Sequence, residues 1–108
     1  DARPVDLVLF YVPCPSAAVA RSLVRSLVLA RRIACGNVVA ADSMYRWSGT
    51  IAEESEWVAV MKTTEPLADL VAASIAEHHP YSVPCIGRIV MTVNAEYGTW
   101  VANQCGDV

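Results

Sequence analysis

The sequence lacks a basic stripe. It holds 8 Lys and Arg against 11 Asp and Glu, which gives a formal net charge of -3 at pH 7. The basic residues are scattered along the chain, and Arg31-Arg32 is their only adjacent pair. Proteins that bind nucleic acid neutralise phosphates with clustered Lys and Arg. We therefore expect no nucleic-acid partner.

Long apolar runs are also missing. A helix that crosses a bilayer needs ~20 consecutive apolar residues, and no stretch of this chain approaches that length. The first residues have neither the positive segment nor the apolar segment of a secretory signal. We expect no membrane partner and a cytoplasmic location, while a signal removed ahead of residue 1 stays open.

Cysteine is present, but not in pairs. The four thiols, Cys14, Cys35, Cys85 and Cys105, are 21, 50 and 20 residues apart, and no two form a CxxC motif. This spacing excludes a zinc ribbon and a thioredoxin motif. The pattern is typical of separate thiols in a reducing compartment rather than of a disulfide framework.

The stretch that organises the chain is residues 37–63, where apolar, aromatic and β-branched residues lie on both sides of Ser48-Gly49. This pattern predicts two long antiparallel strands of about a dozen residues each, joined at a turn in which Gly49 takes a positive φ. Such a hairpin extends beyond its own core. A second copy of the chain is the expected cover, because an exposed apolar edge recruits partners. The 55% share of hydrophobic residues agrees with an oligomer.

The remaining pattern completes a β-α-β-β-α-β order within one domain, residues 1–108. Residues 5–12 predict a central strand ended by Pro13 and Pro15. Ser16 predicts the N-cap of a helix. A second helix is expected from Pro66, then a stiff connector at residues 79–84, a last strand at residues 85–93 and a short C-terminal helix or tail from Glu96.

The expected inner residues of the two long helices are Val19, Ala20, Leu23, Val24, Leu27, Val28 and Arg31 in the first, and Leu67, Leu70, Val71 and Ile75 in the second. The fold class is α+β, a ferredoxin-like sandwich with a long central hairpin.

Three residues are candidate metal ligands: Cys35, His79 and Cys85. Cys35 follows the first helix. His79 begins the connector that follows the second helix, and Cys85 begins the strand after that connector. We expect these helix-to-strand junctions at the same edge of the sheet, so that the three side chains converge within one subunit or across an interface. Thiolate and imidazole suit copper or zinc. The alternative is that Cys35 and Cys85 are small buried hydrophobes and that His78 closes a helix end.

Other polar and aromatic groups indicate structure rather than chemistry. Glu53, Glu54 and Glu56 are expected at a solvated edge of the hairpin. Gly36 is expected at a positive φ after the first helix. No catalytic signature surrounds any Cys-His pair, and we do not expect an enzyme. Interface anchors are expected among the large aromatic residues, Tyr45, Trp47, Trp57, Tyr97 and Trp100.

Five short segments stand in register along the chain: 34–38 (ACGNV), 43–49 (SMYRWSG) with Ile51, 61–63 (MKT), 78–84 (HHPYSVP) and 97–100 (YGTW). In order and spacing they resemble the CutA divalent-cation-tolerance family, from Val5 to about Gln104. The resemblance implies a tight homotrimer, similar in architecture to the PII signalling trimers, and a link to tolerance of copper and other divalent cations.

The resemblance carries proposed metal ligands over to Cys35 and His79, with two departures. Phe10 stands where some members have a further cysteine, and Cys85 stands where a glutamate is usual. The second departure would shift the site toward softer metals such as Cu(I). Two other hypotheses are a PII-like regulatory trimer that binds a small effector or protein partner, with incidental metal binding, and a stable trimer that serves as a scaffold.

Overall fold

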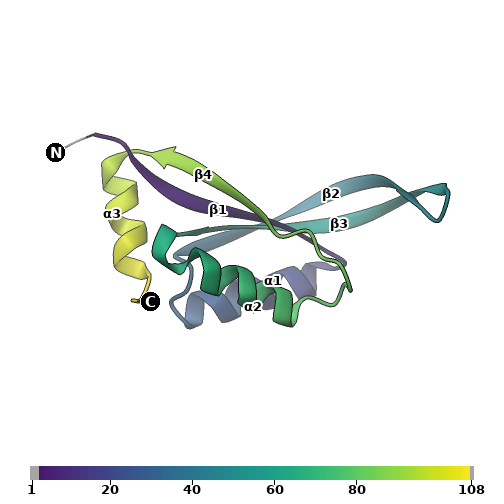
Figure 1. Ribbon diagram of the computed structural model, residues 1–108, viewed down its shortest axis with the longest axis horizontal. Coiled ribbons are helices and arrows are strands. Elements are labelled where there is room, and N and C mark those ends of the chain that lie inside the picture. Colours follow the sequence, from purple (N-terminus) through teal and green to yellow (C-terminus); the bar gives the residue numbers. More distant parts are fainter. Residues whose placement is uncertain (1–2, 108) are drawn as a thin grey trace.

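A computed structural model describes residues 3–107 of the chain. The elements follow the order β1 (Val5–Cys14), α1 (Ala17–Leu29), β2 (Cys35–Trp47), β3 (Thr50–Thr63), the short 3₁₀ helix η1 (Glu65–Leu67), α2 (Ala68–His78), β4 (Gly87–Val93) and α3 (Ala95–Gln104). The four strands form one sheet in the order β2-β3-β1-β4, and each neighbouring pair is antiparallel. Helices α1 and α2 cover one face (Figure 1). The predicted ferredoxin-like α+β class is confirmed.

The core lies between that sheet face and the two helices. Its fully buried side chains include Phe10 of β1, Met61 of β3 and Ile75 of α2. On α1, Ala20, Leu23 and Leu27 face the sheet. The predicted N-cap is confirmed, because the Val19 N–H donates to the Ser16 hydroxyl at 3.1 Å.

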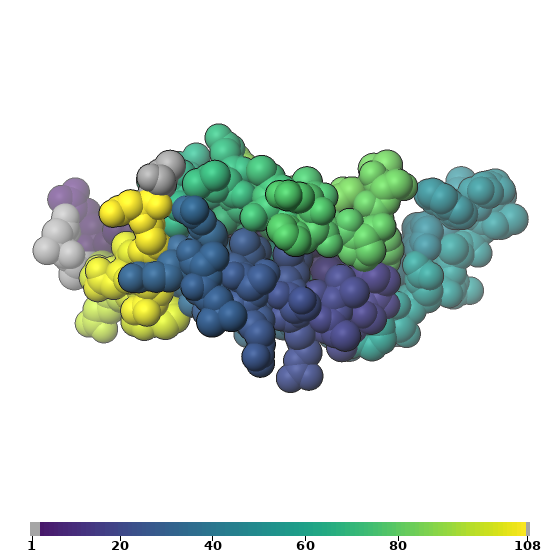
Figure 2. Space-filling model, turned by 90° about the horizontal axis from the view of Figure 1, so that it is seen from below, coloured from purple at the N-terminus to yellow at the C-terminus, as the bar shows by residue number. Residues whose placement is uncertain are grey.

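The hairpin of β2 and β3 is the longest feature of the molecule. Trp47 pairs with Thr50, and both central turn residues have positive φ, 50° at Ser48 and 80° at Gly49. Two positive φ values give the twist that a two-residue hairpin loop needs, and the prediction for Gly49 is confirmed. The distal half projects past the helices (Figures 1 and 2), and the chain measures 53 × 25 × 20 Å.

Several predicted boundaries were wrong. β1 continues through Pro13 to Cys14, while its pairing with β4 ends at Tyr11. Pro13 therefore lies where β1 has β3 as its only neighbour, and there a missing N–H is tolerated. The last strand, β4, begins at Gly87 rather than at the predicted Cys85. In α2, Leu70 was predicted to face the core but is 41% exposed, and Ala68 is buried instead.

The end of α1 also differs from prediction. Val28 and Arg31 are exposed, and the left-handed residue that ends the helix is Arg31, with φ 58°. Gly36 lacks a positive φ; it is needed for close packing, because a Cβ there would lie 2.7 Å from Cγ1 of Val24. The glycine lets α1 approach β2.

The C-terminal segment forms a full helix, α3, that lies across one end of the sheet (Figure 1). Gly98 permits this approach, because a side chain there would collide with Val5 and crowd Val93. The Arg31 guanidinium donates from Nε to the Gln104 carbonyl at 3.0 Å and from Nη2 to the Asn103 carbonyl at 2.8 Å. The end of α1 thereby holds the end of α3.

Candidate functional site

His79 is fixed at both ring nitrogens. The Tyr81 N–H donates to Nδ1 at 3.1 Å, and Nε2 lies 2.9 Å from the Pro13 carbonyl oxygen. A backbone N–H can only donate and a carbonyl can only accept, so the imidazole carries its proton on Nε2. His79 is 8% exposed, and its ring packs on Tyr81 with centroids 4.8 Å apart. The imidazole joins the connector to the end of β1.

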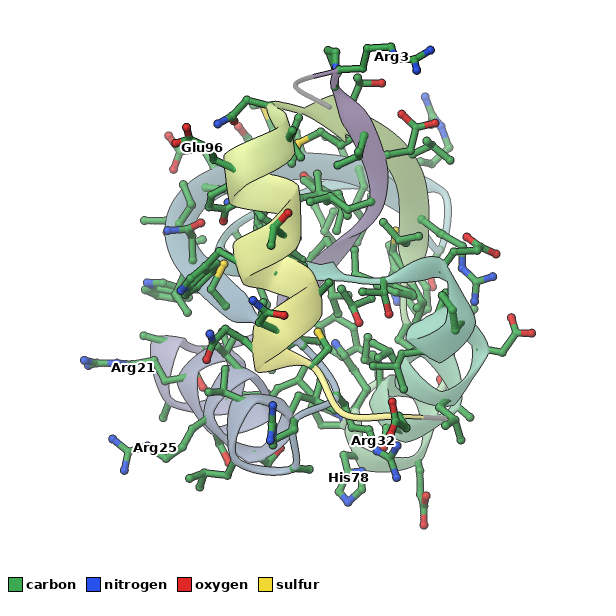
Figure 3. The ribbon with its side chains drawn as sticks, turned by 90° about the vertical axis from the view of Figure 1, so that its left-hand side faces the viewer. Arg3, Arg21, Arg25, Arg32, His78 and Glu96 are labelled. Atoms are coloured by element: carbon green, nitrogen blue, oxygen red, sulfur yellow. The ribbon has the colours of Figure 1, made fainter. Side chains whose placement is uncertain are left out.

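His78 has a different role. Its Nδ1 lies 2.8 Å from the Ser74 carbonyl, one turn back in α2, and Figure 3 shows its side chain pointing away from the body of the protein. A histidine in the last turn meets the negative end of the helix dipole. This is the placement predicted for a residue that closes the helix.

A buried carboxylate lies beside the connector. Glu56 is 9% exposed and accepts a hydrogen bond from the Tyr81 hydroxyl at 2.9 Å. Burial, and then the Glu56 carboxylate, raise the pKa of Tyr81 to about 12. The prediction of a solvated edge fits Glu53 and Glu54, which are exposed, and is wrong for Glu56.

Cys35 lies on the other face of the sheet. Its neighbour Gly36 faces α1, so the Cys35 side chain points to the opposite side, which we call the open face. The thiol Sγ lies 3.3 Å from the Tyr97 hydroxyl of α3, and the Lys62 ammonium lies 5.3 Å from the centre of the Tyr97 ring. The hydrogen bond with Cys35, followed by burial, raises the pKa of Tyr97. Cys35 is half-buried rather than a core residue.

The other three thiols divide by exposure. Cys14 and Cys105 are buried, and burial raises the pKa of both thiols. A raised thiol pKa disfavours the thiolate that binds metals. Cys85 is exposed on the connection between α2 and β4, so the alternative of a buried small hydrophobe does not describe it.

The structure does not bring Cys35 and His79 together within one chain. Cys35 pairs with Lys62, Lys62 pairs with Leu9, and His79 contacts Pro13, four residues further along β1. Four residues of strand span about 13 Å. The expected common edge was wrong for a single chain, because β1 and β3 are antiparallel and their crossover helices run in opposite directions. In residues 3–107, no group of three or more His, Cys, Asp or Glu side chains is arranged to hold a metal ion. Convergence across an interface stays a prediction.

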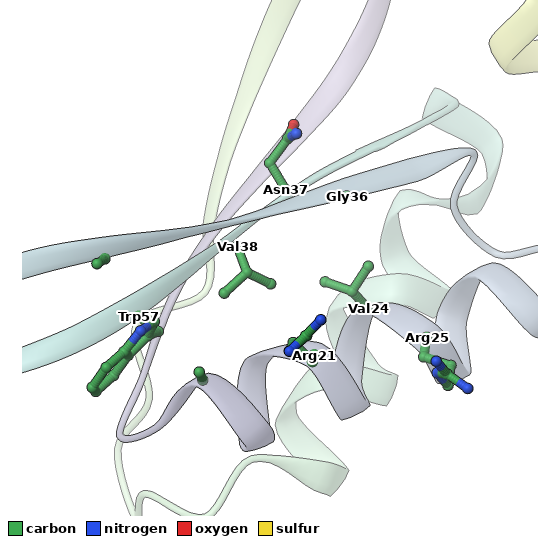
Figure 4. Close-up of a pocket in the computed structure, with 9 residues that line it drawn as sticks. Arg21, Val24, Arg25, Gly36, Asn37, Val38 and Trp57 are labelled. Atoms are coloured by element: carbon green, nitrogen blue, oxygen red, sulfur yellow. The ribbon is translucent and has the colours of Figure 1, made fainter.

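Sequence reasoning missed a groove of about 610 Å³ between α1 and the edge strand β2 (Figure 4). Its apolar lining includes Val24, Val38 and Trp57, and Arg21 and Arg25 of α1 contribute its cationic side. The two arginines are one helical turn apart, which is a readable signal, but the open edge of β2 that completes the groove depends on strand order.

Comparison with known proteins gives consistent matches. A family model described as CutA1 divalent ion tolerance protein matches residues 8–104. The chain is 36% identical over 99 residues to the divalent-cation tolerance protein CutA of Pyrococcus horikoshii, covering 91% of this chain and 97% of that protein. The crystal structure of CutA1 from that organism has a TM-score of 0.89 at 35% identity, covering 93% of this chain and 99% of the other.

Two further solved structures share the architecture. CutA from Synechococcus elongatus PCC7942 has a TM-score of 0.92 at 26% identity, with 98% of this chain and 96% of the other covered. A protein from Archaeoglobus fulgidus, described as periplasmic divalent cation tolerance protein CutA, has a TM-score of 0.86 at 24% identity, with 93% and 98% covered, and this likeness shows the fold alone. In residues 3–107, no helix is long and apolar enough to cross a membrane.

Proposed function

Because the chain belongs to the CutA1 divalent ion tolerance family, we propose that it takes part in the cellular response to divalent metal ions. In this proposal the chain binds a copper-like ion as cargo, with the Cys35 thiol as the first ligand, in an assembly of three copies. The observation that carries the proposal is the position of Cys35. Its thiol is half-buried on the open face beside Tyr97, whereas Cys14 and Cys105 are buried in the core.

The remaining ligands would come from a neighbouring copy. His79 and Cys85 lie on the connection that follows α2, at the end of the sheet opposite Cys35. In a ring of copies, head-to-tail contacts bring unlike surfaces together. Cys35 of one copy would thus meet His79 or Cys85 of the next. Ligation by Nε2 of His79 would replace its hydrogen bond to Pro13, while the exposed Cys85 thiol has no such cost.

Two features support assembly. β2 and β4 are the outer strands of the sheet, so each has an unpaired edge available to another copy. Apolar side chains are also exposed on the open face, at Tyr11 (44%), Val39 (50%) and Ile89 (52%). On the projecting hairpin, Trp47 is 69% exposed and Ile51 58% exposed. Burial of these side chains in a subunit contact would stabilise the ring.

Calorimetric titration of the reduced protein with Cu(I) and Cu(II) tests the metal proposal. We expect binding in proportion to subunits, lost in Cys35→Ser and weakened in Cys85→Ser or His79→Ala. Cys105→Ala is the matched control, because it removes a thiol from the core and leaves the candidate ligands in place. Copper binding that is unchanged in Cys35→Ser would exclude the proposed site.

The groove at Arg21 and Arg25 favours a second candidate function, a PII-like regulatory trimer that binds a small acidic effector or a protein partner. The groove borders the free edge of β2, where a neighbouring copy would lie. A thermal-shift screen of acidic metabolites separates the two, because a ligand that binds the folded state raises the melting temperature by mass action. Stabilisation lost in an Arg21→Met, Arg25→Met variant, with copper binding intact, would favour the effector.

The proposed location is the cytoplasm, where reduced thiols would be available as ligands. All four cysteines are unpaired in the structure, which supports this location. Fractionation of cells with an antibody to the chain is the measurement, and recovery in an oxidising compartment would contradict the proposal.

A further inference from the structure

Lys62 is the only lysine of the chain, and its surroundings are unusual for a surface cation. It is partly buried on β3, directly opposite Cys35 of β2, and both side chains point to the open face. In residues 3–107, no carboxylate lies within ion-pair distance of its ammonium. Lys side chains that leave bulk water are usually paired. Among the described residues, this ammonium has the Tyr97 ring beside it and no carboxylate partner.

Three different donor groups meet at this point. The Lys62 ammonium lies 5.3 Å from the Tyr97 ring centre, and the Tyr97 hydroxyl lies 3.3 Å from the Cys35 thiol. The Trp100 ring packs against Tyr97 with centroids 5.6 Å apart and is 43% exposed. Two strands and α3 thus supply an ammonium, a phenol and a thiol beside an accessible aromatic surface.

We propose that Lys62 and Tyr97, with Cys35 beside them, form a binding site for a small organic carboxylate. The carboxylate would accept hydrogen bonds from the Lys62 ammonium and the Tyr97 hydroxyl. A single positive charge matches a monoanion, and charge-assisted hydrogen bonds to carboxylate oxygens are the strong ones.

The surroundings indicate what the rest of the ligand is like. Next to Lys62 on the open face is Leu9, which is half-buried. With Trp100 on the α3 side, the ammonium is bordered by apolar and aromatic surface. Ligand sites commonly combine a mostly apolar lining with a few placed polar groups. The carboxylate is therefore expected to carry an apolar or aromatic body.

This site adjoins the proposed metal ligand Cys35, goes beyond the proposed metal function and depends on two other residues for binding the anion. Lys62 and Tyr97 are not metal ligands in that proposal, and the anion is expected to bind when no metal is present. The two proposals can therefore fail separately. Copper binding should be lost in Cys35→Ser, whereas carboxylate binding should be weakened in Lys62→Met and in Tyr97→Phe. The anion experiment is done on protein treated with a chelator.

The single lysine makes a direct experiment possible. Reductive methylation with ¹³C-formaldehyde labels Lys62 and the N-terminal amine and keeps both positively charged. The whole chain is then titrated with benzoate, with its neutral analogue benzamide and with inorganic phosphate, at constant ionic strength. Calorimetry on unmodified protein measures the affinity for benzoate in Lys62→Met and Tyr97→Phe, with Arg25→Met as a control for the loss of one positive charge.

We expect benzoate to shift the Lys62 signal in a saturable way, benzamide to leave it in place and phosphate to have the weaker effect. Loss of one charge-assisted hydrogen bond should weaken benzoate binding roughly tenfold or more in Tyr97→Phe and in Lys62→Met. Arg25→Met should bind like the wild type. Equal responses to benzoate and benzamide, or a Lys62 shift no larger than that of the N-terminal amine, would overturn the proposal. Circular dichroism of each variant confirms that it is folded.

Discussion

At the scale of single residues, the imidazole of His79 holds the connector in place through two backbone hydrogen bonds and a contact with Tyr81. His79→Ala removes both hydrogen bonds and leaves a cavity, so we expect a loss of about 2–4 kcal/mol in the free energy of unfolding. Urea denaturation measures it. The adjacent exposed His78→Ala is the control and should change stability by less than about 1 kcal/mol. Equal effects of the two substitutions would contradict the structural role of His79.

Gly36 is a second residue where one atom decides the packing. In Gly36→Ala the new Cβ would lie 2.7 Å from Cγ1 of Val24, so α1 or the Val24 side chain must move. We expect a loss of about 1–3 kcal/mol, the usual range for overpacking. In a double-mutant cycle with Val24→Ala, the second substitution should recover part of the loss, because the two positions share one contact. Additive losses would show that Gly36 acts through backbone conformation.

Tyr81 provides a pH-dependent prediction. Its pKa is raised from 10.0 to about 12, so the folded chain holds the phenol proton more tightly than the unfolded chain does. The resulting stabilisation is complete below pH 10 and is lost as the pH rises through about 12. We expect Tyr81→Phe to lower stability at neutral pH and to flatten its alkaline decline.

Thermal denaturation of Tyr81→Phe and wild type from neutral to alkaline pH makes this measurement. Tyr45→Phe is the matched control, since it also removes a hydroxyl bonded to a glutamate, Glu54, but on the exposed hairpin. An unchanged alkaline decline in Tyr81→Phe would contradict the assignment.

At the scale of elements, the sequence predicted the strands and helices well because their signals are local. The Ser16 cap and the Ser48-Gly49 turn depend on neighbouring residues, and both are confirmed. The predicted positive φ at Gly36 was wrong, because Arg31 takes the left-handed position, and its long-range bonds to α3 support it there. Such a bond joins residues 73 apart in sequence, and periodicity gives no sign of it.

The candidate site was less predictable for a related reason. Residue type identified Cys35 and His79 as potential ligands, but their separation follows from the opposite directions of β1 and β3. Glu56 resembles Glu54 in the sequence, and each accepts a hydrogen bond from a tyrosine hydroxyl. Glu56 is buried beside the connector that holds Tyr81, whereas Glu54 is exposed on the projecting hairpin. The local sequence pattern predicts where a helix or strand forms, whereas the neighbours of a side chain depend on how the whole sheet is assembled.

The contact between the ends of α1 and α3 gives a prediction at this scale. Arg31→Asn keeps a residue that tolerates the left-handed conformation and removes both guanidinium bonds to α3. We expect faster amide hydrogen exchange in the last turn of α3, with exchange in the middle of α1 unchanged. Arg32→Asn is the control, because within residues 3–107 the Arg32 guanidinium makes one hydrogen bond, which is longer, 3.4 Å to the Asp107 carbonyl. Uniformly faster exchange across the chain would indicate global destabilisation.

At the scale of the whole molecule, the projecting hairpin governs the expected assembly. Trp47 is 69% exposed in the single chain, so its truncation removes little from the core. If the hairpin lies in a subunit contact, Trp47→Ala should favour smaller species on dilution, with a loss of about 2 kcal/mol or more in assembly free energy. Sedimentation velocity over a dilution series measures this. Leu29→Ala, which removes a 76% exposed side chain from the end of α1, is the control. A monomeric wild type would contradict the assembly proposal.

The strand order also has a consequence for how the chain is made. β1 leaves the ribosome before the other three strands of the sheet, yet in the sheet it lies between β3 and β4. Its pairing with β4 joins Val5 to Val93, so one side of β1 stays unpaired until the chain has been synthesised past Val93. The hairpin of β2 and β3 can form early, because its ends are close in sequence. Until β4 has been made, the β4-facing edge of β1 is therefore open to pairing with other chains, as exposed edge strands are.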